Sequence, residues 1–251
     1  MDESLFFSVS YHKLTVVGTD APSSYYLSAA AYSSAFGAGF DNTTTTAILH
    51  YQNTYNKTHK RTPTPPSPNA TAAATQFTRR LRSPSPQSVP TQIDTHLVIA
   101  ASVNFLNTSG AGPFGRRFAA SLNNVSFVPP ASVDILQAYY KGINGVYTTD
   151  FPEKPPKGFD YTGKDLPGEL LVPEFGTRAV VLEYNVDVEM VLQGTNVLAS
   201  DNHPMHLHGY GFYVVGWGFG NFDSRDGPLG YNLVNPPQVT TVGTIQISFV
   251  L

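Results

Sequence analysis

Three histidines, His203, His206 and His208, lie within six residues of one another in the segment HPMHLHG. Neutral imidazole nitrogens bind copper, zinc, iron and nickel, and copper has the highest affinity of these for a given donor set. If the chain is extended from His206 to His208, both side chains point to one face, because strand side chains alternate. His203 has the opposite parity, so this run predicts two neighbouring metal sites rather than one site with three histidines.

A carboxylate that could complete such a site is not evident from the sequence. Asp201 is the nearest one along the chain, and the backbone would have to turn back for it to join two of the histidines. A mononuclear metal enzyme of the cupin type is an alternative, but it requires a glutamate ligand that the sequence does not place nearby. The other four histidines (His12, His50, His59 and His96) are isolated, and we interpret them as structural or exposed.

The composition excludes several classes of protein. Only 13% of the 251 residues are charged, about half of the roughly 25% that is typical of soluble domains. The 16 Phe and 14 Tyr residues argue against disorder, because such a chain can bury apolar surface. The absence of cysteine excludes a disulfide scaffold and any thiolate ligand from these residues. The net charge of −3 indicates neither nucleic acid nor a membrane surface as a partner.

Short runs of β-branched and aromatic residues predict many strands and few helices. The expected strands are two short ones within 5–17 and one each at 45–51, 97–105, 118–128, 178–184, 186–192, 210–217 and 245–249. The strand at 186–192 alternates apolar and polar residues, as a half-buried strand does. Helices are expected at 72–82 and after Pro130, where Ile135, Leu136, Tyr139 and Tyr140 would form one apolar face. This arrangement predicts a β-sandwich or a barrel.

Residues 56–70 are rich in proline and predict an extended linker. No acidic residue lies between Asp41 and Asp94, so a basic patch for a polyanion is the alternative interpretation of this stretch. Five Asn-x-Ser/Thr sequons are candidate glycosylation sites, at Asn42, Asn56, Asn69, Asn107 and Asn124. The N-terminus has no basic and apolar signal pattern, and no apolar run is long enough to span a bilayer.

The segment HPMHLHG at 203–209, continued by YGFYVVGWGFGNFD at 210–223, closely resembles the third cupredoxin domain of plant laccases, which are blue multicopper oxidases. Further segments that resemble laccases lie at 5–21, 43–51, 124–130, 136–151 and 228–234. The resemblance implies an all-β protein of the cupredoxin-like Greek-key β-sandwich type, with a few short helices. It divides the chain into an incomplete second domain (1–55), the linker (56–70) and a C-terminally truncated third domain (71–251).

The resemblance also implies roles for the three histidines. His203 would bind the type 1 copper, which accepts the substrate electron, His206 the type 2 copper, and His208 a type 3 copper, where dioxygen is reduced to water. The complete family enzyme holds four coppers and oxidises phenols or lignin precursors. Its partners are therefore phenolic small molecules and dioxygen, with no nucleic acid, no membrane and no implied oligomeric state. The family is secreted to the apoplast.

This sequence departs from the family at the residues that carry its chemistry. A blue copper site needs a cysteine thiolate, which the family supplies from a His-Cys-His segment, and this chain has no cysteine. The family's His-x-His pairs from its first domain also have no counterpart here. We therefore expect the chain alone to be inactive. The alternative to a laccase-like function is a non-enzymatic copper-binding remnant or a fragment of a gene model.

Overall fold

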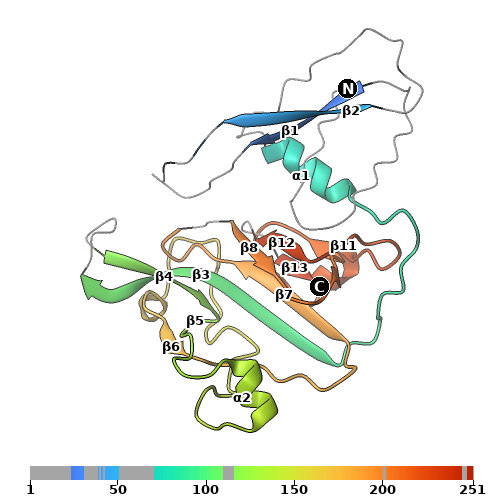
Figure 1. Ribbon diagram of the computed structural model, residues 1–251. Coiled ribbons are helices and arrows are strands. Elements are labelled where there is room, and N and C mark those ends of the chain that lie inside the picture. The colour runs from blue at the N-terminus through green and yellow to red at the C-terminus, as the bar shows by residue number, and fades with distance from the viewer. Residues whose placement is uncertain are drawn as a thin grey trace. The chain divides into compact units, whose positions relative to one another are not determined.

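The computed structural model describes residues 24–30, 39, 41, 43–50, 71–109, 116–199, 202–244 and 248–250. The chain divides into two compact units, residues 1–81 and 82–251 (Figure 1). The two strands expected within 5–17 and the whole of the expected linker, 56–70, lie outside the described residues.

The first unit contains a two-stranded antiparallel sheet and one helix. Strand β1 (Ser24–Ala30) pairs with β2 (Thr44–His50), with Ser24 opposite His50 and Ala30 opposite Thr44. Helix α1 (Thr71–Arg80) follows. The strand expected at 45–51 and the helix expected at 72–82 are confirmed within two residues at each end.

The second unit is built on a seven-stranded mixed sheet. Its strands are β3 (Thr95–Ser109), β4 (Arg116–Leu122), β5 (Val125–Phe127), β6 (Glu174–Gly176), β7 (Val188–Gly194), β10 (Gly216–Trp217) and β13 (Ser248–Val250). Their order across the sheet is β10-β13-β7-β3-β4-β5-β6, and the long central strands β3 and β7 run parallel (Figure 1). Two smaller antiparallel sheets pair β8 (His203–His206) with β12 (Thr241–Thr244), and β9 (Phe212–Tyr213) with β11 (Gln238–Val239).

Apolar side chains cover both faces of the central strands. On one face Leu97, Ile99 and Leu192 form a buried cluster, against which Met205 of β8 and Val242 of β12 pack. On the other face the buried Val191 and Val215 are packed by partly buried residues that include Tyr213 and Tyr231. Removing this apolar surface from water is the main favourable term for folding. The β8–β12 pair is therefore a second layer over the large sheet, and the predicted all-β sandwich is confirmed.

The single strand expected at 118–128 is wrong, because a hairpin turn interrupts it. Asn123 and Asn124 have φ angles of 48° and 62°, and they separate β4 from β5. A two-residue turn with positive φ at both positions matches the twist of paired strands, and asparagine tolerates that conformation. The Asn123 side chain then accepts a hydrogen bond of 2.7 Å from the Ala100 backbone N–H. The turn is thus tied to the neighbouring strand.

Three other expected strands differ from the structure. The segment 178–184 forms a single bridge, from Arg178 to Thr148, because no strand among the described residues pairs with the rest of it. The segment 210–217 divides into β9 and β10, since the chain crosses there from the small sheet to the large one. Strand β7 is not half-buried throughout. Its last four residues are buried, because it lies between β3 and β13 and is covered on both faces. The strand expected at 245–249 falls partly on residues outside the description.

Helix α2 (Ile135–Lys141) begins where the Asp134 carboxylate caps the Gln137 N–H at 2.8 Å, and it ends at Gly142, whose φ is 63°. The expected apolar face is wrong. Ala138 is the buried residue of this helix, whereas Tyr140 is 82% exposed. In a helix of two turns the caps decide where it starts and stops, and the apolar pattern alone does not decide which side is buried. The short 3₁₀ helices η2 (Gly168–Leu170) and η3 (Gly227–Gly230) complete the unit. Among the described helices, none combines the length and apolarity that crossing a membrane requires.

Candidate metal centre

Strand β8 carries two of the three clustered histidines, one at each end. His203 lies opposite Thr244 and His206 opposite Thr241 in the antiparallel pair with β12. Because this sheet has two strands, both are edge strands, where a residue without an N–H such as Pro204 is tolerated. His203 and Met205 are half-buried while Pro204 and His206 are exposed. The opposite parity of His203 and His206 that the sequence predicts is therefore observed.

The structure brings His206 and His208 together. Their ring centroids are 4.8 Å apart, and the ring planes are nearly perpendicular at 78°. His208 lies in the turn after β8, beside Gly209, whose φ of 79° is a conformation that glycine adopts without strain. The Nδ1 atom of His206 lies 2.7 Å from the Thr240 carbonyl oxygen and 2.8 Å from Thr241 Oγ1. One of the two rings is thus held in place by its neighbours.

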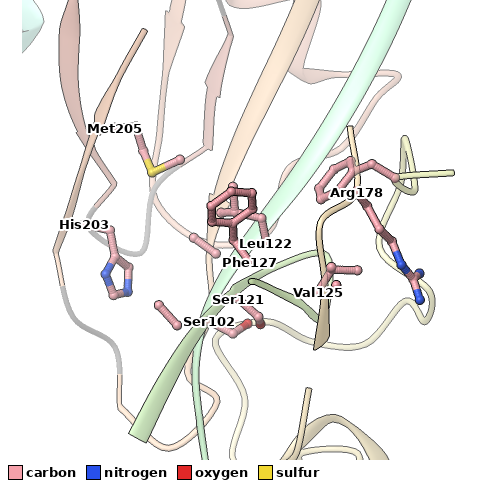
Figure 2. A pocket seen from close by; sticks show the side chains of 12 residues that line it. Ser102, Ser121, Leu122, Val125, Phe127, Arg178, His203 and Met205 are labelled. Carbon is pink, nitrogen blue, oxygen red and sulfur yellow. The ribbon is translucent and has the colours of Figure 1, made fainter. Parts of the chain in front are cut away.

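His203 lies apart from this pair and lines a cavity of about 400 Å³. Figure 2 shows His203 and Met205 on one wall, with side chains of β4 and β5 such as Leu122 and Phe127 across from them. Most of the lining is apolar. Arg178 also borders the cavity, but its guanidinium is paired with Glu174 at 2.5 Å. The cavity therefore presents the His203 imidazole to a mainly apolar space.

The donors present fit a copper site in part. Two adjacent imidazoles are suitable ligands for copper. Over the described ranges, however, no group of three or more His, Asp, Glu or Cys side chains is arranged to hold a metal ion, and Asp201 is not described. The glutamate that a cupin-type site needs is likewise not found beside the histidines within those ranges. A blue copper centre does not fit these residues, because the 251-residue sequence holds no cysteine.

A second histidine network lies on β3 and β7. His96 Nδ1 is hydrogen-bonded to Glu189 Oε2, and the Tyr231 hydroxyl donates to Glu189 Oε1 at 2.8 Å. The His96 side chain is 60% exposed and the Glu189 side chain 12% exposed. Burial, together with the hydrogen bond to Glu189, raises the pKa of Tyr231. The interpretation of His96 as structural or exposed agrees with this arrangement. His50 lies in β2, whereas His12 and His59 lie outside the described residues.

Sequence reasoning missed the partners of both histidines. Thr240 and Thr241 are 34 and 35 residues from His206, and Glu189 is 93 residues from His96. No local spacing connects groups this distant. The pairing of β8 with β12 and of β3 with β7 creates these contacts. Local patterns in one sequence do not reveal which strands pair.

Comparison with known proteins shows what this chain is similar to. Residues 150–249, which include all three clustered histidines, match the family model described as multicopper oxidase. Laccase-14 of Arabidopsis thaliana is 51% identical over 97% of this chain and 48% of its own length. Over nearly all of its residues the chain is therefore similar to plant laccases. Laccase-3 of Arabidopsis thaliana (44% identical) and putative laccase-17 of Oryza sativa subsp. japonica (41%) each match 97% of it.

The chain spans about half the length of the curated relatives it matches, at 48% to 50% of each. The expected β-sandwich and the expected copper chemistry both agree with a multicopper oxidase domain. Of the sequon asparagines, Asn42, Asn56 and Asn69 are not described. Asn107 lies in β3, and Asn124 lies in the β4–β5 turn with its Oδ1 buried and no hydrogen-bond partner for it among the described residues.

Proposed function

We propose that this chain contributes copper ligands to a laccase-type oxidase, which oxidises phenols and passes their electrons to dioxygen. The observation that carries the proposal is the 4.8 Å approach of the His206 and His208 rings, inside the stretch that matches multicopper oxidases. By resemblance His206 would serve a type 2 copper, His208 a type 3 copper and His203 a type 1 copper. Copper supplies one-electron transfer when it is bound, and the residues of this chain hold and orient it.

The geometry supports different roles for the two faces of β8. His206 and His208 point outward and close together, as ligands of neighbouring coppers would. His203 faces the cavity with Met205. A blue centre at His203 would need a thiolate from outside these 251 residues.

A second candidate function is copper binding without oxidation by this chain alone. It is favoured by the absence of cysteine from the sequence and by the two-imidazole donor set, which leaves a copper ion short of ligands. Metal-site function depends on the complete ligand set and its geometry. For the 251 residues by themselves we therefore infer copper uptake without turnover.

The substrates, partners and location follow from the family. Phenolic small molecules would be the reductants and dioxygen the oxidant of the whole enzyme. Secretion to the apoplast is proposed on the same basis, and the five sequons would then be available to the glycosylation machinery. Asn124 lies in a tight turn with its side-chain oxygen buried.

The test is a copper titration of the purified chain by equilibrium dialysis, followed by visible absorption and oxygen consumption with a phenol. We expect saturable copper uptake, no intense thiolate-to-copper absorption, and no phenol oxidation above that of the same free copper. A blue, active preparation would overturn the view that the chain alone is inactive. Absence of saturable uptake would overturn both candidate functions.

Sequencing the transcript through both ends of the coding region and across the codons after Ala21 separates the two candidates further. A cysteine codon flanked by histidine codons in the same reading frame would support a laccase-type oxidase. A verified transcript that encodes these 251 residues alone would support the non-enzymatic alternative.

A further inference from the structure

The exposed ring of His206 is held by two oxygen atoms, one in the bend before β12 and one on the first residue of β12. Its Nδ1 lies 2.7 Å from the carbonyl oxygen of Thr240 and 2.8 Å from the hydroxyl oxygen of Thr241. The same Thr240 carbonyl also accepts the Leu207 N–H at 3.1 Å. An exposed side chain ordinarily samples several rotamers. Here backbone and side-chain contacts restrict the ring to one orientation.

The carbonyl contact decides which nitrogen of His206 carries the proton. A carbonyl oxygen can only accept a hydrogen bond, so Nδ1 must be the donor and must bear hydrogen. In the neutral imidazole the other nitrogen, Nε2, then has a free lone pair. The Thr241 hydroxyl is compatible with this tautomer, because a hydroxyl can accept as well as donate.

The local fold explains why these acceptors are there. Strands β11 and β12 are separated by a bend at Thr240, and Thr241 begins β12 directly opposite His206. The bend brings the Thr240 carbonyl within reach of both the His206 ring and the Leu207 N–H. A threonine has a restricted χ1 angle, so its hydroxyl direction is well defined. The corner between β11 and β12 therefore forms a rigid support for the ring.

We propose that this corner, Thr240–Thr241, positions His206 so that Nε2 is the nitrogen that binds copper, with Thr241 as a positioning residue. The inference rests on the proposed copper site at His206. Hydrogen bonds to the distal nitrogen of a metal-binding histidine set its tautomer and ring orientation, and their loss typically costs about 10–100-fold in metal affinity. His208, 4.8 Å away, has its ring edge-on to His206.

The tautomer is tested directly on the metal-free chain by nitrogen-15 NMR of histidine-labelled protein. In the wild type we expect His206 to be protonated at Nδ1. Thr241→Val removes the hydroxyl at nearly constant shape and keeps the Thr240 carbonyl, so we expect Nδ1 to stay protonated while the ring is held less firmly and copper binding weakens about 10-fold. Thr241→Ser restores the hydroxyl and should restore the copper affinity. Thr240→Val is the matched control, because it changes a side chain next to the site and keeps the carbonyl.

The outcomes distinguish the positioning from the proposed function. An Nε2-protonated His206 in the wild type, or a Thr241→Val variant that matches the wild type in copper affinity, would overturn the positioning role. An Nδ1-protonated His206 in a chain that takes up no copper would overturn the copper site and leave the support of the ring in place. Unfolding midpoints of all four proteins identify any variant whose fold has changed. In that case the wild-type tautomer and the rescue by Thr241→Ser decide.

Discussion

Two exposed histidines in the second unit have the same kind of anchor and different surroundings. His206 and His96 both use Nδ1 to contact a side chain on a neighbouring strand. For His206 the acceptors are a carbonyl and a hydroxyl, and a second imidazole lies 4.8 Å away. For His96 the acceptor is the nearly buried carboxylate of Glu189, whose other oxygen is held by Tyr231. Both His206 and His96 therefore have an anchored imidazole ring, but of the two, His206 is the one with a second imidazole, that of His208, beside it.

This difference indicates what makes a histidine a candidate ligand in this fold. An anchored Nδ1 prepares Nε2 for a metal, but one imidazole alone is a weak site. At His206 the neighbouring ring of His208 supplies a second donor. At His96 the contacts join β3, β7 and the segment after η3, which suits a structural role.

The largest effect should come from removing the paired donors. In the double variant His206→Ala/His208→Ala we expect copper affinity to fall by more than the roughly 10–100-fold that loss of a supporting contact costs. The matched control is His96→Ala, which removes an exposed and anchored histidine without a neighbouring ring. Equilibrium dialysis measures both. Equal losses in the two proteins, or no loss in the double variant, would show that the pair is not the site.

Local patterns in the sequence predicted part of the fold. β-Branched runs located β2 and β3, because a pleated, half-buried surface favours those residues. The same runs concealed the turn at Asn123 and Asn124, since apolar residues continue on both sides of it. At 178–184 the pattern is that of a strand, but a strand needs a partner, and the part of the chain that the structure describes provides none beyond the bridge at Arg178.

The sequence predicted that His203 and His206 lie on opposite faces of the strand, but it did not predict the contacts that hold the His206 ring. Alternation along β8 separates His203 from His206, and that follows from backbone geometry alone. The contacts of His206 with Thr240 and Thr241 depend on how β12 pairs with β8 and on the bend before β12. Such long-range pairing is decided by the whole sheet and its packing, so no short segment encodes it.

The Glu189 network should contribute to stability rather than to copper binding. Glu189→Ala leaves the half-buried Tyr231 hydroxyl without its acceptor, and we expect the free energy of unfolding to fall by about 2 kcal/mol. His96→Ala should cost less than about 1 kcal/mol, because that side of the pair is exposed. Urea unfolding measures both, and copper uptake should be unchanged in each. If His96→Ala costs as much as Glu189→Ala, the exposed histidine is as important to the fold as the tyrosine contact.

Tyr231 should also make stability depend on alkaline pH. Burial and the hydrogen bond to Glu189 raise the pKa of Tyr231 in the folded chain. Its contribution is therefore complete below the ordinary tyrosine pKa of about 10 and is lost as the pH rises above it. The difference in unfolding free energy between wild type and Tyr231→Phe should shrink over that range. The control is Tyr184→Phe, at a residue that is 98% exposed. If the unfolding free energy of this variant showed the same pH dependence relative to wild type, Tyr231 would not be the cause.

The smallest effect on stability should appear at Asp160, an exposed carboxylate whose hydrogen bonds come from Asn221 and Thr162. A side-chain hydrogen bond from Asn221 (2.8 Å), followed by bonds from Thr162, holds the pKa of Asp160 below its usual range. A carboxylate with a lowered folded pKa stabilises the protein above about pH 4, and this contribution is lost as the pH falls below that value. The stability difference between wild type and Asp160→Asn should therefore be present near neutrality and disappear in acid. Asp165→Asn, in the same loop, is the matched control for urea unfolding across this range. Because Asp160 is exposed, solvent screens its interactions. We therefore expect burial of the acceptor, more than the number of hydrogen bonds it receives, to decide how much a contact contributes to stability. A loss of unfolding free energy in Asp160→Asn as large as that in Glu189→Ala would contradict this expectation.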